Sequence, residues 1–364
     1  MGLSPDNQPS ANRAPAAEPP SFNVGAGRHL RAYALFLAAV FYFFIARSVA
    51  HHSAQGLAGD LWSPLLEQAM LAFLLLVGYS AMGYMFQRQI HPVRAQGLPR
   101  REGWPREFGM GLATGWGVAV VCVLPMLAIG GIAITLSLRA SEWGWLLADA
   151  AFFLLATLAE ELAFRGYPFQ RFVDAVGSFG AVVGFSLFYA VVQSLAPGSN
   201  RVSFAVSVIL GILLSTAYLR TRALWVSWGI NFGWKASRAL LFGLVVAGVG
   251  SHSSVVEGDP MGPFWITGGG FGLDATWIAF FVLLAAIAVM VRMTRDLDFQ
   301  VNAPVIVPGG IPVDLDAAAR AQHEAAMGTA PAPPPLVQIV PAASPAPPPM
   351  PEARETRSEP PPGA

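Results

Sequence analysis

Eight stretches of this chain are apolar over about the length that a helix needs to cross a membrane. Such a helix takes about 20 residues, because each residue advances it by about 1.5 Å through a hydrocarbon layer of about 30 Å. The chain is 54% hydrophobic and 12% charged, which is more apolar than a soluble globule. These features predict an all-α fold, a polytopic membrane helix bundle with about eight transmembrane helices. The predicted spans are residues 30–50, 62–86, 109–136, 145–164, 178–196, 203–219, 224–249 and 275–293.

The arginines predict the orientation of these spans, because short cytoplasmic loops of membrane proteins carry an excess of positive charge. On one side, the connecting loops hold Arg139 and Arg201 beside several acids. We therefore expect an integral membrane protein, in the plasma (inner) membrane, with both termini cytoplasmic. The arginines assigned to the cytoplasmic side are Arg13, Arg28, Arg88, Arg94, Arg100, Arg101, Arg106, Arg171, Arg220, Arg222, Arg292 and Arg295.

Charge and cysteine content argue against several classes of function. The formal net charge is zero and the arginines lie in short loops, so no nucleic-acid partner is expected. The single cysteine, Cys122, excludes an intrachain disulfide and a multi-cysteine metal site. Zinc takes three or four His, Cys or carboxylate ligands, and the spans offer carboxylates with one distant cysteine. We predict neither a metal nor another cofactor.

Two adjacent glutamates, Glu160 and Glu161, lie with Arg165 at the end of one predicted span. A charge at the centre of a membrane helix costs about 2.5 to 3.5 kcal/mol on insertion scales, so these residues indicate a site. Glu161 and Arg165 have the spacing and order of a favourable helical ion pair. Glu160 projects about 100° away, which leaves it available for proton transfer. Asp149 is either part of the same polar lining or a residue at the membrane interface.

Two further spans carry polar residues four positions apart. Tyr189 and Gln193 lie on one face of the first, and Asn231 and Lys235 on one face of the second. Lys235 is the only lysine of the chain, and a cation within the membrane needs an anion or a water-filled pocket. Alternatively, Gln193 and Asn231 form ordinary hydrogen bonds between helices, as polar residues do in membrane bundles.

Three segments around these residues match the motifs of one family of membrane proteins. The segment EELAFRGYPFQRF, Glu160 to Phe172, is similar to a motif EExxxR followed by glycine. The segment SLFYAVVQSLAPGSN resembles a motif in which histidine follows an aromatic residue by four positions. In this chain Tyr189 occupies the aromatic position and Gln193 the histidine position.

The third segment, TRALWVSWGINFGWK, resembles the motif HxxxN, with Asn231 at the histidine position and Lys235 at the asparagine position. Over about residues 145–238 the chain therefore resembles the CPBP family, the CAAX-protease and bacteriocin-processing membrane proteins also called Abi. The resemblance implies a glutamic-type intramembrane endopeptidase, in which the first glutamate activates the water that attacks a peptide carbonyl.

The resemblance also implies a role for each motif position. Glu160 would be the general base, and Glu161 with Arg165 a structural ion pair. The histidine position of the second motif, here Gln193, would help to hold the water. The two positions of the third motif, here Asn231 and Lys235, would face the oxyanion. The candidate catalytic residues are thus Glu160, Glu161, Arg165, Gln193, Asn231 and Lys235.

Three of these positions depart from the family pattern. Gln193 can hydrogen-bond a water but cannot titrate, and Lys235 can lock Glu160 in a salt bridge. Loss of an oxyanion donor costs about 2.7 to 4 kcal/mol, and loss of an acid or base partner about 10² to 10⁴ in rate. We therefore expect weak or lost activity. No histidine is placed to replace the missing motif histidines, because all six lie in predicted tails, loops or span ends. They are His29, His51, His52, His91, His252 and His323.

The resemblance and the composition together predict the organisation of the chain. Pro/Ala-rich segments bury too little apolar surface to fold, so both ends are expected to be disordered cytoplasmic tails. The longer tail is either a spacer or a ligand that binds a protein partner. The predicted regions are an N-terminal tail at 1–29, N-terminal spans at 30–136, the CPBP-like core at 137–249, an extracytoplasmic loop with the last span at 250–298, and the Pro/Ala-rich tail at 299–364.

Three functional hypotheses follow from the sequence. The first is an intramembrane endopeptidase of CPBP type that cleaves membrane-associated or prenylated peptides and contacts membrane lipid. The second is a catalytically silent member of the same fold that binds or scaffolds a partner. The third is a small transporter with a proton or ion path through Asp149, Glu160 and Lys235. Cleavage that depends on Glu160 would distinguish the first hypothesis from the other two.

Overall fold

A computed structural model of the protein describes residues 23–137, 139–247, 253, 255–302, 305–306 and 312–313. Contacts group the chain into two units, Met1–Ala303 and Pro304–Ala364. The second unit contains a short antiparallel pair, β3 (Val305–Ile306) and β4 (Pro312–Val313). All other described elements belong to the first unit, which contains the candidate site.

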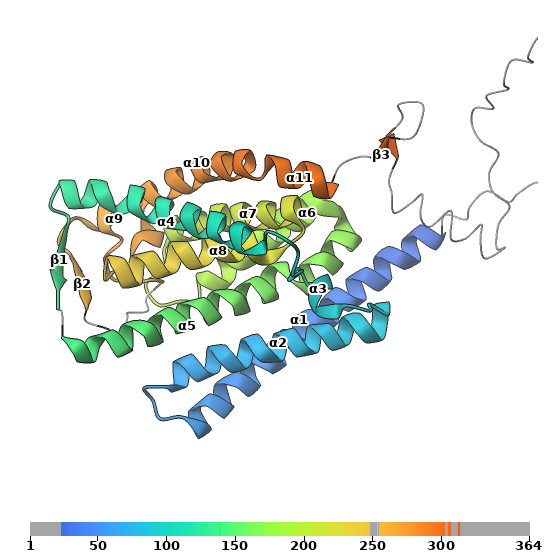
Figure 1. Ribbon diagram of the computed structural model, residues 1–364, viewed down its shortest axis with the longest axis horizontal. Coiled ribbons are helices and arrows are strands. Elements are labelled where there is room, and N and C mark those ends of the chain that lie inside the picture. The colour runs from blue at the N-terminus through green and yellow to red at the C-terminus, as the bar shows by residue number, and fades with distance from the viewer. Residues whose placement is uncertain are drawn as a thin grey trace, which may run out of the picture. The chain divides into compact units, whose positions relative to one another are not determined.

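The first unit is a bundle of apolar helices, which confirms the predicted all-α membrane fold (Figure 1). Its main helices are α1 (Asn23–Leu57), α2 (Ser63–Gln87), α4 (Trp104–Ala128), α5 (Ala140–Arg165), α6 (Tyr167–Gln193), α7 (Arg201–Thr221), α8 (Leu224–Ala236) and α10 (Trp277–Met293). The shorter helical elements are α3 (Pro92–Ala95), α9 (Phe264–Thr267), α11 (Arg295–Asn302), the π-helix η1 (Ser237–Leu241) and the 3₁₀ turns η2 (Gly269–Phe271) and η3 (Leu273–Ala275).

Within the described residues, five helical segments are long and apolar enough to cross a membrane: Gly27–Leu57, Ser63–Gln87, Trp104–Ala128, Ala140–Gln193 and Arg201–Thr221. The fourth contains both α5 and α6, and α10 is a shorter apolar helix. Large apolar side chains such as Phe41, Phe73 and Phe281 are more than 60% exposed on the outside of the bundle. That exposure suits a protein whose outer surface is solvated by lipid, and the chain is an integral membrane protein.

Two predicted spans end earlier than the sequence indicated. Helix α4 stops at Ala128, and residues 132–136 form strand β1 (Ile132–Leu136), antiparallel to β2 (Val256–Pro260). Glycine at 130, with φ of 70°, turns the chain there, and the β-branched residues that follow favour a strand. The predicted span 224–249 instead contains α8 and η1 and ends at Leu241.

The predicted tails lie largely outside the described residues, and their inner edges are helical. Residues 23–29 belong to the first turns of α1, and residues 299–302 to the last turn of α11. Within α6 the helix is kinked at Gly177, where φ is 84° and ψ is 164°. The predicted span 178–196 therefore corresponds to the part of α6 after this kink, with its end at Gln193.

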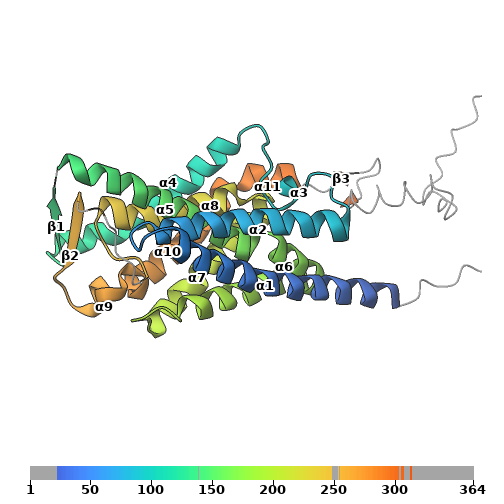
Figure 2. The same ribbon diagram turned by 90° about the horizontal axis from the view of Figure 1, so that it is seen from below.

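Helix α8 lies inside the bundle, where it packs against α4, α5 and α7 (Figures 1 and 2). Gly111 and Gly115 of α4 face Gly229 and Gly233 of α8, so that the two backbones touch. A Cβ atom on Gly233, for example, would lie 2.5 Å from the carbonyl oxygen of Leu112. Small residues at such positions let membrane helices approach closely.

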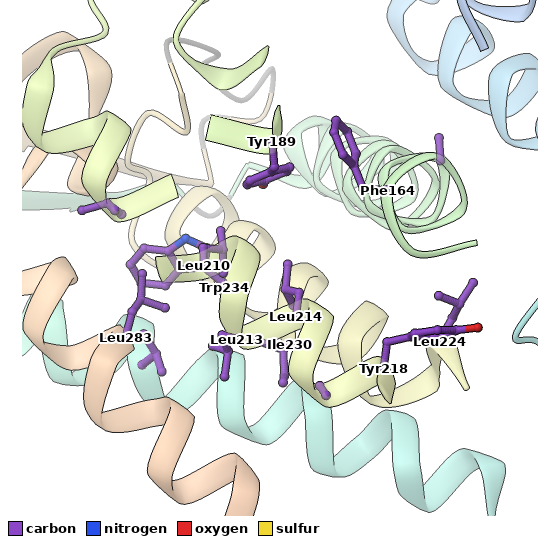
Figure 3. Packing of buried hydrophobic residues seen from close by; sticks show 14 of the residues in the cluster. Phe164, Tyr189, Leu210, Leu213, Leu214, Tyr218, Leu224, Ile230, Trp234 and Leu283 are labelled. Atoms are coloured by element: carbon purple, nitrogen blue, oxygen red, sulfur yellow. The ribbon is translucent and has the colours of Figure 1, made fainter. Parts of the chain in front are cut away.

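On its other side α8 contributes to an apolar core shared with α7 and α10 (Figure 3). Trp234 is fully buried there. Tight apolar contacts of this kind stabilise a membrane bundle through dispersion rather than through exclusion of water. Core residues visible in the close view include Leu210, Leu213, Leu214, Ile230, Trp234 and Leu283.

Candidate active site

The two glutamates lie in the last turns of α5, next to the point where the chain reverses. The helix ends at Arg165, and Gly166 with φ of −75° and ψ of −138° leads directly into α6. Pro168 occupies the first turn of α6, where its missing N–H costs nothing. The glutamates are therefore held on a rigid helix rather than on a loop.

Glu161 and Arg165 form an ion pair within α5, with 3.3 Å between Arg165 Nη1 and Glu161 Oε1. Both side chains are buried, with exposures of 1% for Arg165 and 0% for Glu161. The guanidinium also lies over the ring of Tyr189, at 4.9 Å from its centroid. Burial makes each charge dependent on the other, because an unpaired ion in this position would be strongly destabilising.

Glu160 has a different environment, because its partners come from α8. Its Oε1 accepts a hydrogen bond from Lys235 Nζ at 2.5 Å, and its Oε2 accepts one from Asn231 Nδ2 at 3.0 Å. Asn231 Nδ2 also donates to Glu161 Oε1 at 2.9 Å. The Glu160 side chain is 27% exposed and that of Lys235 10%. The structure thus brings both glutamates together with Asn231 and Lys235.

Gln193 is the last residue of α6 and is directed to its own helix. Its Nε2 donates to the hydroxyl of Tyr189 at 2.8 Å. Among the described residues it makes no hydrogen bond to Glu160 or to Lys235. Gln193 is thus linked to the site through Tyr189, whose ring packs against Arg165.

Asp149 belongs to a different part of α5. It lies more than two turns before Glu160, and its Oδ2 accepts a hydrogen bond from the backbone N–H of Ser253 at 2.9 Å. Together with Trp62 and Trp145 it borders a small crevice at that end of the helix. The Asp149 carboxylate is thus bound by the backbone of Ser253, about three turns before the glutamates.

Arg238, one turn after Lys235, has a partner that the sequence did not indicate. Arg238 Nη1 donates to Asp274 Oδ2 at 2.7 Å. Trp234 Nε1 donates to the other oxygen of Asp274 at 3.1 Å, and Arg238 lies over the Trp234 ring at 3.9 Å. The only signal in the sequence was an acid placed directly before the last span.

A second unforeseen contact fixes α8 to α5 one helical turn from the glutamates. Trp228 Nε1 donates to Thr157 Oγ1 and to the carbonyl oxygen of Leu154, both at 3.2 Å. Buried indole N–H groups usually find such partners. This contact, together with the glycine contact to α4, holds the polar face of α8 opposite α5.

The chemistry of the site is that of carboxylates, amides and cations. In the part of the chain that the structure describes, no three His, Cys, Asp or Glu side chains gather as metal ligands would. His29, His51, His52 and His91 lie away from the site, His51 being paired with Glu67 at 2.8 Å. His252 and His323 fall outside the described residues. Three polar atoms of the site, Glu161 Oε2, Arg165 Nε and Asn231 Oδ1, are buried with no hydrogen bond among the described residues.

Comparison with known proteins identifies the same part of the chain. The family model of the type II CAAX prenyl endopeptidase Rce1-like proteins matches residues 142–237. No curated protein and no solved structure matches the chain significantly. The matched segment runs from the first turn of α5 to the end of α8 and contains all six candidate residues. Residues 142–237 of this membrane protein are thus similar to the Rce1-like type II CAAX prenyl endopeptidases, which supports the predicted resemblance to the CPBP family.

Proposed function

We propose that this protein is a CPBP-fold membrane protein with a silenced peptidase centre, which binds membrane-associated polypeptides without efficiently cleaving them. The observation that carries the proposal is the salt bridge of 2.5 Å between Lys235 Nζ and Glu160 Oε1. A general base must direct a free lone pair at the water that it deprotonates. In Glu160 each carboxylate oxygen already accepts a hydrogen bond, one from Lys235 and one from Asn231, so these two donors compete with a water for the carboxylate.

Lys235 also occupies the place that a water would need at Glu160. Water activation requires a water to contact the Glu160 carboxylate, whereas Lys235 Nζ occupies the position beside Oε1 at 2.5 Å. The family's water-holding histidine is also replaced, and Gln193 is engaged with Tyr189. Each of these substitutions removes part of the machinery that the family motifs imply.

A second function, slow intramembrane proteolysis, is favoured by one observation. The Glu160 side chain remains 27% exposed, so that a water or a peptide carbonyl can reach it when Lys235 moves. In that case Glu160 would activate the water, while Asn231 and Lys235 would donate to the oxyanion. The substrate would be a membrane-associated or prenylated peptide.

The orientation that we propose places this site near the cytoplasmic surface of the plasma membrane. Glu160 lies five residues before the end of α5, at the end of the bundle where the arginine-rich connections lie. The excess of positive charge on that side supports cytoplasmic termini. A polypeptide would then reach the site from the cytoplasmic half of the bilayer.

Cleavage of a membrane-presented peptide library in proteoliposomes tests the proposal. We expect the wild type to cleave no faster than Glu160→Ala, and to retain library peptides in a binding assay with the same liposomes. The combined variant Gln193→His, Asn231→His and Lys235→Asn restores the family pattern. It should gain cleavage by about 10²-fold or more, and adding Glu160→Ala should abolish that gain.

The outcomes separate the two candidate functions. Cleavage by the wild type that is lost in Glu160→Ala would establish a peptidase and reject silencing. Absence of peptide binding by the wild type would reject the binding function. Thermal unfolding of each variant shows whether it is folded. If the combined variant does not fold, the single variant Lys235→Asn is tested in its place.

A further inference from the structure

The connection between α2 and α4 forms a fixed surface at the arginine-rich end of the bundle. The carbonyl oxygens of Gly97 and Pro99 accept hydrogen bonds from the Leu224 N–H at 2.6 Å and the Trp225 indole at 2.9 Å. Gln170 Nε2 of α6 donates to the Ala95 carbonyl oxygen at 2.8 Å. The connection, which includes α3, is therefore anchored to the bundle at several points (Figure 1).

This surface carries more positive charge than the protein itself neutralises. Residues 88–107 contain five arginines and two glutamates. One arginine is paired, since Arg101 binds Glu107 at 2.7 Å and the Thr221 carbonyl oxygen at 2.9 Å. The other four are exposed, and their side chains make no hydrogen bond or ion pair among the described residues. They are Arg88, Arg94, Arg100 and Arg106.

Apolar side chains lie between these arginines and are equally exposed. Ile90 is 85% exposed, Val93 44% and Trp104 38%. The segment follows the end of one candidate membrane span, at Gln87, and precedes the start of another, at Trp104. It therefore lies where the hydrocarbon layer meets the lipid headgroups, a level at which apolar, aromatic and basic side chains each find a suitable partner.

The start of α4 adds a second preference for an anion. The helix begins at Trp104 after Gly103, no side chain caps its first turn, and the acid of that turn, Glu107, is already bound to Arg101. Arg106 lies in that turn, where the helix dipole is positive and a cation is disfavoured unless an anion is close.

We propose that Arg88, Arg94, Arg100 and Arg106 form a binding surface for anionic phospholipid headgroups of the membrane. The guanidinium groups would bind the headgroup phosphates, while Ile90, Val93 and Trp104 enter the adjoining acyl region. The occupant is a lipid because the surface combines charge with exposed apolar side chains at the ends of two spans. A free phosphate or an acidic protein would use the charge alone.

Native mass spectrometry of the full-length protein tests this surface. The protein is equilibrated in micelles with equal amounts of phosphatidylglycerol and phosphatidylcholine, and the two bound lipids are counted. We expect phosphatidylglycerol to be enriched. In Arg94→Gln/Arg100→Gln the enrichment should fall by about fivefold for each arginine removed. The matched control is Arg139→Gln/Arg201→Gln, which removes two exposed arginines from the opposite end of the helices and should leave the enrichment unchanged.

Several results would overturn the proposal. Equal binding of the two lipids by the wild type, or unchanged enrichment in Arg94→Gln/Arg100→Gln, would remove the surface as a lipid site. Enrichment lost equally in the control would show a general effect of net charge. Inorganic phosphate that displaces the lipid at matching concentration would indicate a site for free anions. Arg88→Gln/Arg106→Gln provides a second variant if the first does not fold, as judged by thermal unfolding.

Discussion

The two faces of α8 hold the helix in place by opposite means. Toward α4 it presents Gly229 and Gly233, which bring the two backbones into contact. Toward α5 it presents Asn231 and Lys235, which bind the two glutamates. The first face carries no functional group, whereas the second carries the polar residues of the candidate site.

The difference shows how a short helix can carry polar residues within a membrane. The glycine face has no side chains to rearrange, so it sets the position of the helix through contacts of the backbone. The polar face then requires that position, because a charge pair within the membrane depends on close approach. We expect changes to the two faces to differ both in size and in what they impair.

The largest expected effect on stability follows from removing Arg165, the cation that neutralises the buried Glu161. Arg165→Met leaves a carboxylate at 0% exposure without its ion-pair partner. Removal of one member of a buried pair costs about 3 to 5 kcal/mol, and we expect a loss of that size in the free energy of unfolding in micelles. Chemical unfolding monitored by tryptophan fluorescence measures it.

Two further variants control this result. Arg171→Met breaks the pair with Asp174, whose side chain is 49% exposed, and should cost less than about 1 kcal/mol. Glu161→Met combined with Arg165→Met removes both charges and should recover much of the loss. A double variant no more stable than Arg165→Met would show that packing, rather than charge, explains the effect.

The next effect in size concerns the glycine face. In Gly115→Ala the new methyl group meets the backbone carbonyl of Ile230, and overpacking of this kind costs about 1 to 3 kcal/mol. Gly117→Ala is the matched control on the same helix, because nothing lies within 4 Å of its Cβ position. Alanine is the better helix former by about 1 kcal/mol, so the control should be neutral or stabilising. Equal destabilisation by the two changes would contradict close contact between α4 and α8.

Much of this arrangement could be predicted from spacing along single helices. The four-residue interval placed Glu161 beside Arg165, and the same interval put Asn231 and Lys235 on one face of α8. The apolar length of the spans gave the fold class, which the structure confirms. The family resemblance, drawn from short motifs, agrees with the match over residues 142–237.

What could not be predicted depends on contacts between distant segments. Asp274, the partner of Arg238, comes from the turn η3 before α10, and no periodicity relates these two residues. Strand β1 was assigned to a helix because a continuous apolar run does not distinguish a strand from a buried helix. Its pairing with β2 joins segments separated by more than one hundred residues. The kink at Gly177 likewise left no pattern in the apolar sequence.

The smallest expected effect would show how much the polar face contributes to the position of α8. Asn231→Ala removes the amide that donates to both Glu160 and Glu161, and a hydrogen bond between membrane helices contributes about 1 kcal/mol. Ser215→Ala is the control, because this buried hydroxyl makes no hydrogen bond among the described residues and its removal should be neutral. Unfolding in micelles compares both with Gly115→Ala. If Asn231→Ala were the more destabilising of the two, the polar contacts, and not the glycines, would fix α8 against its neighbours.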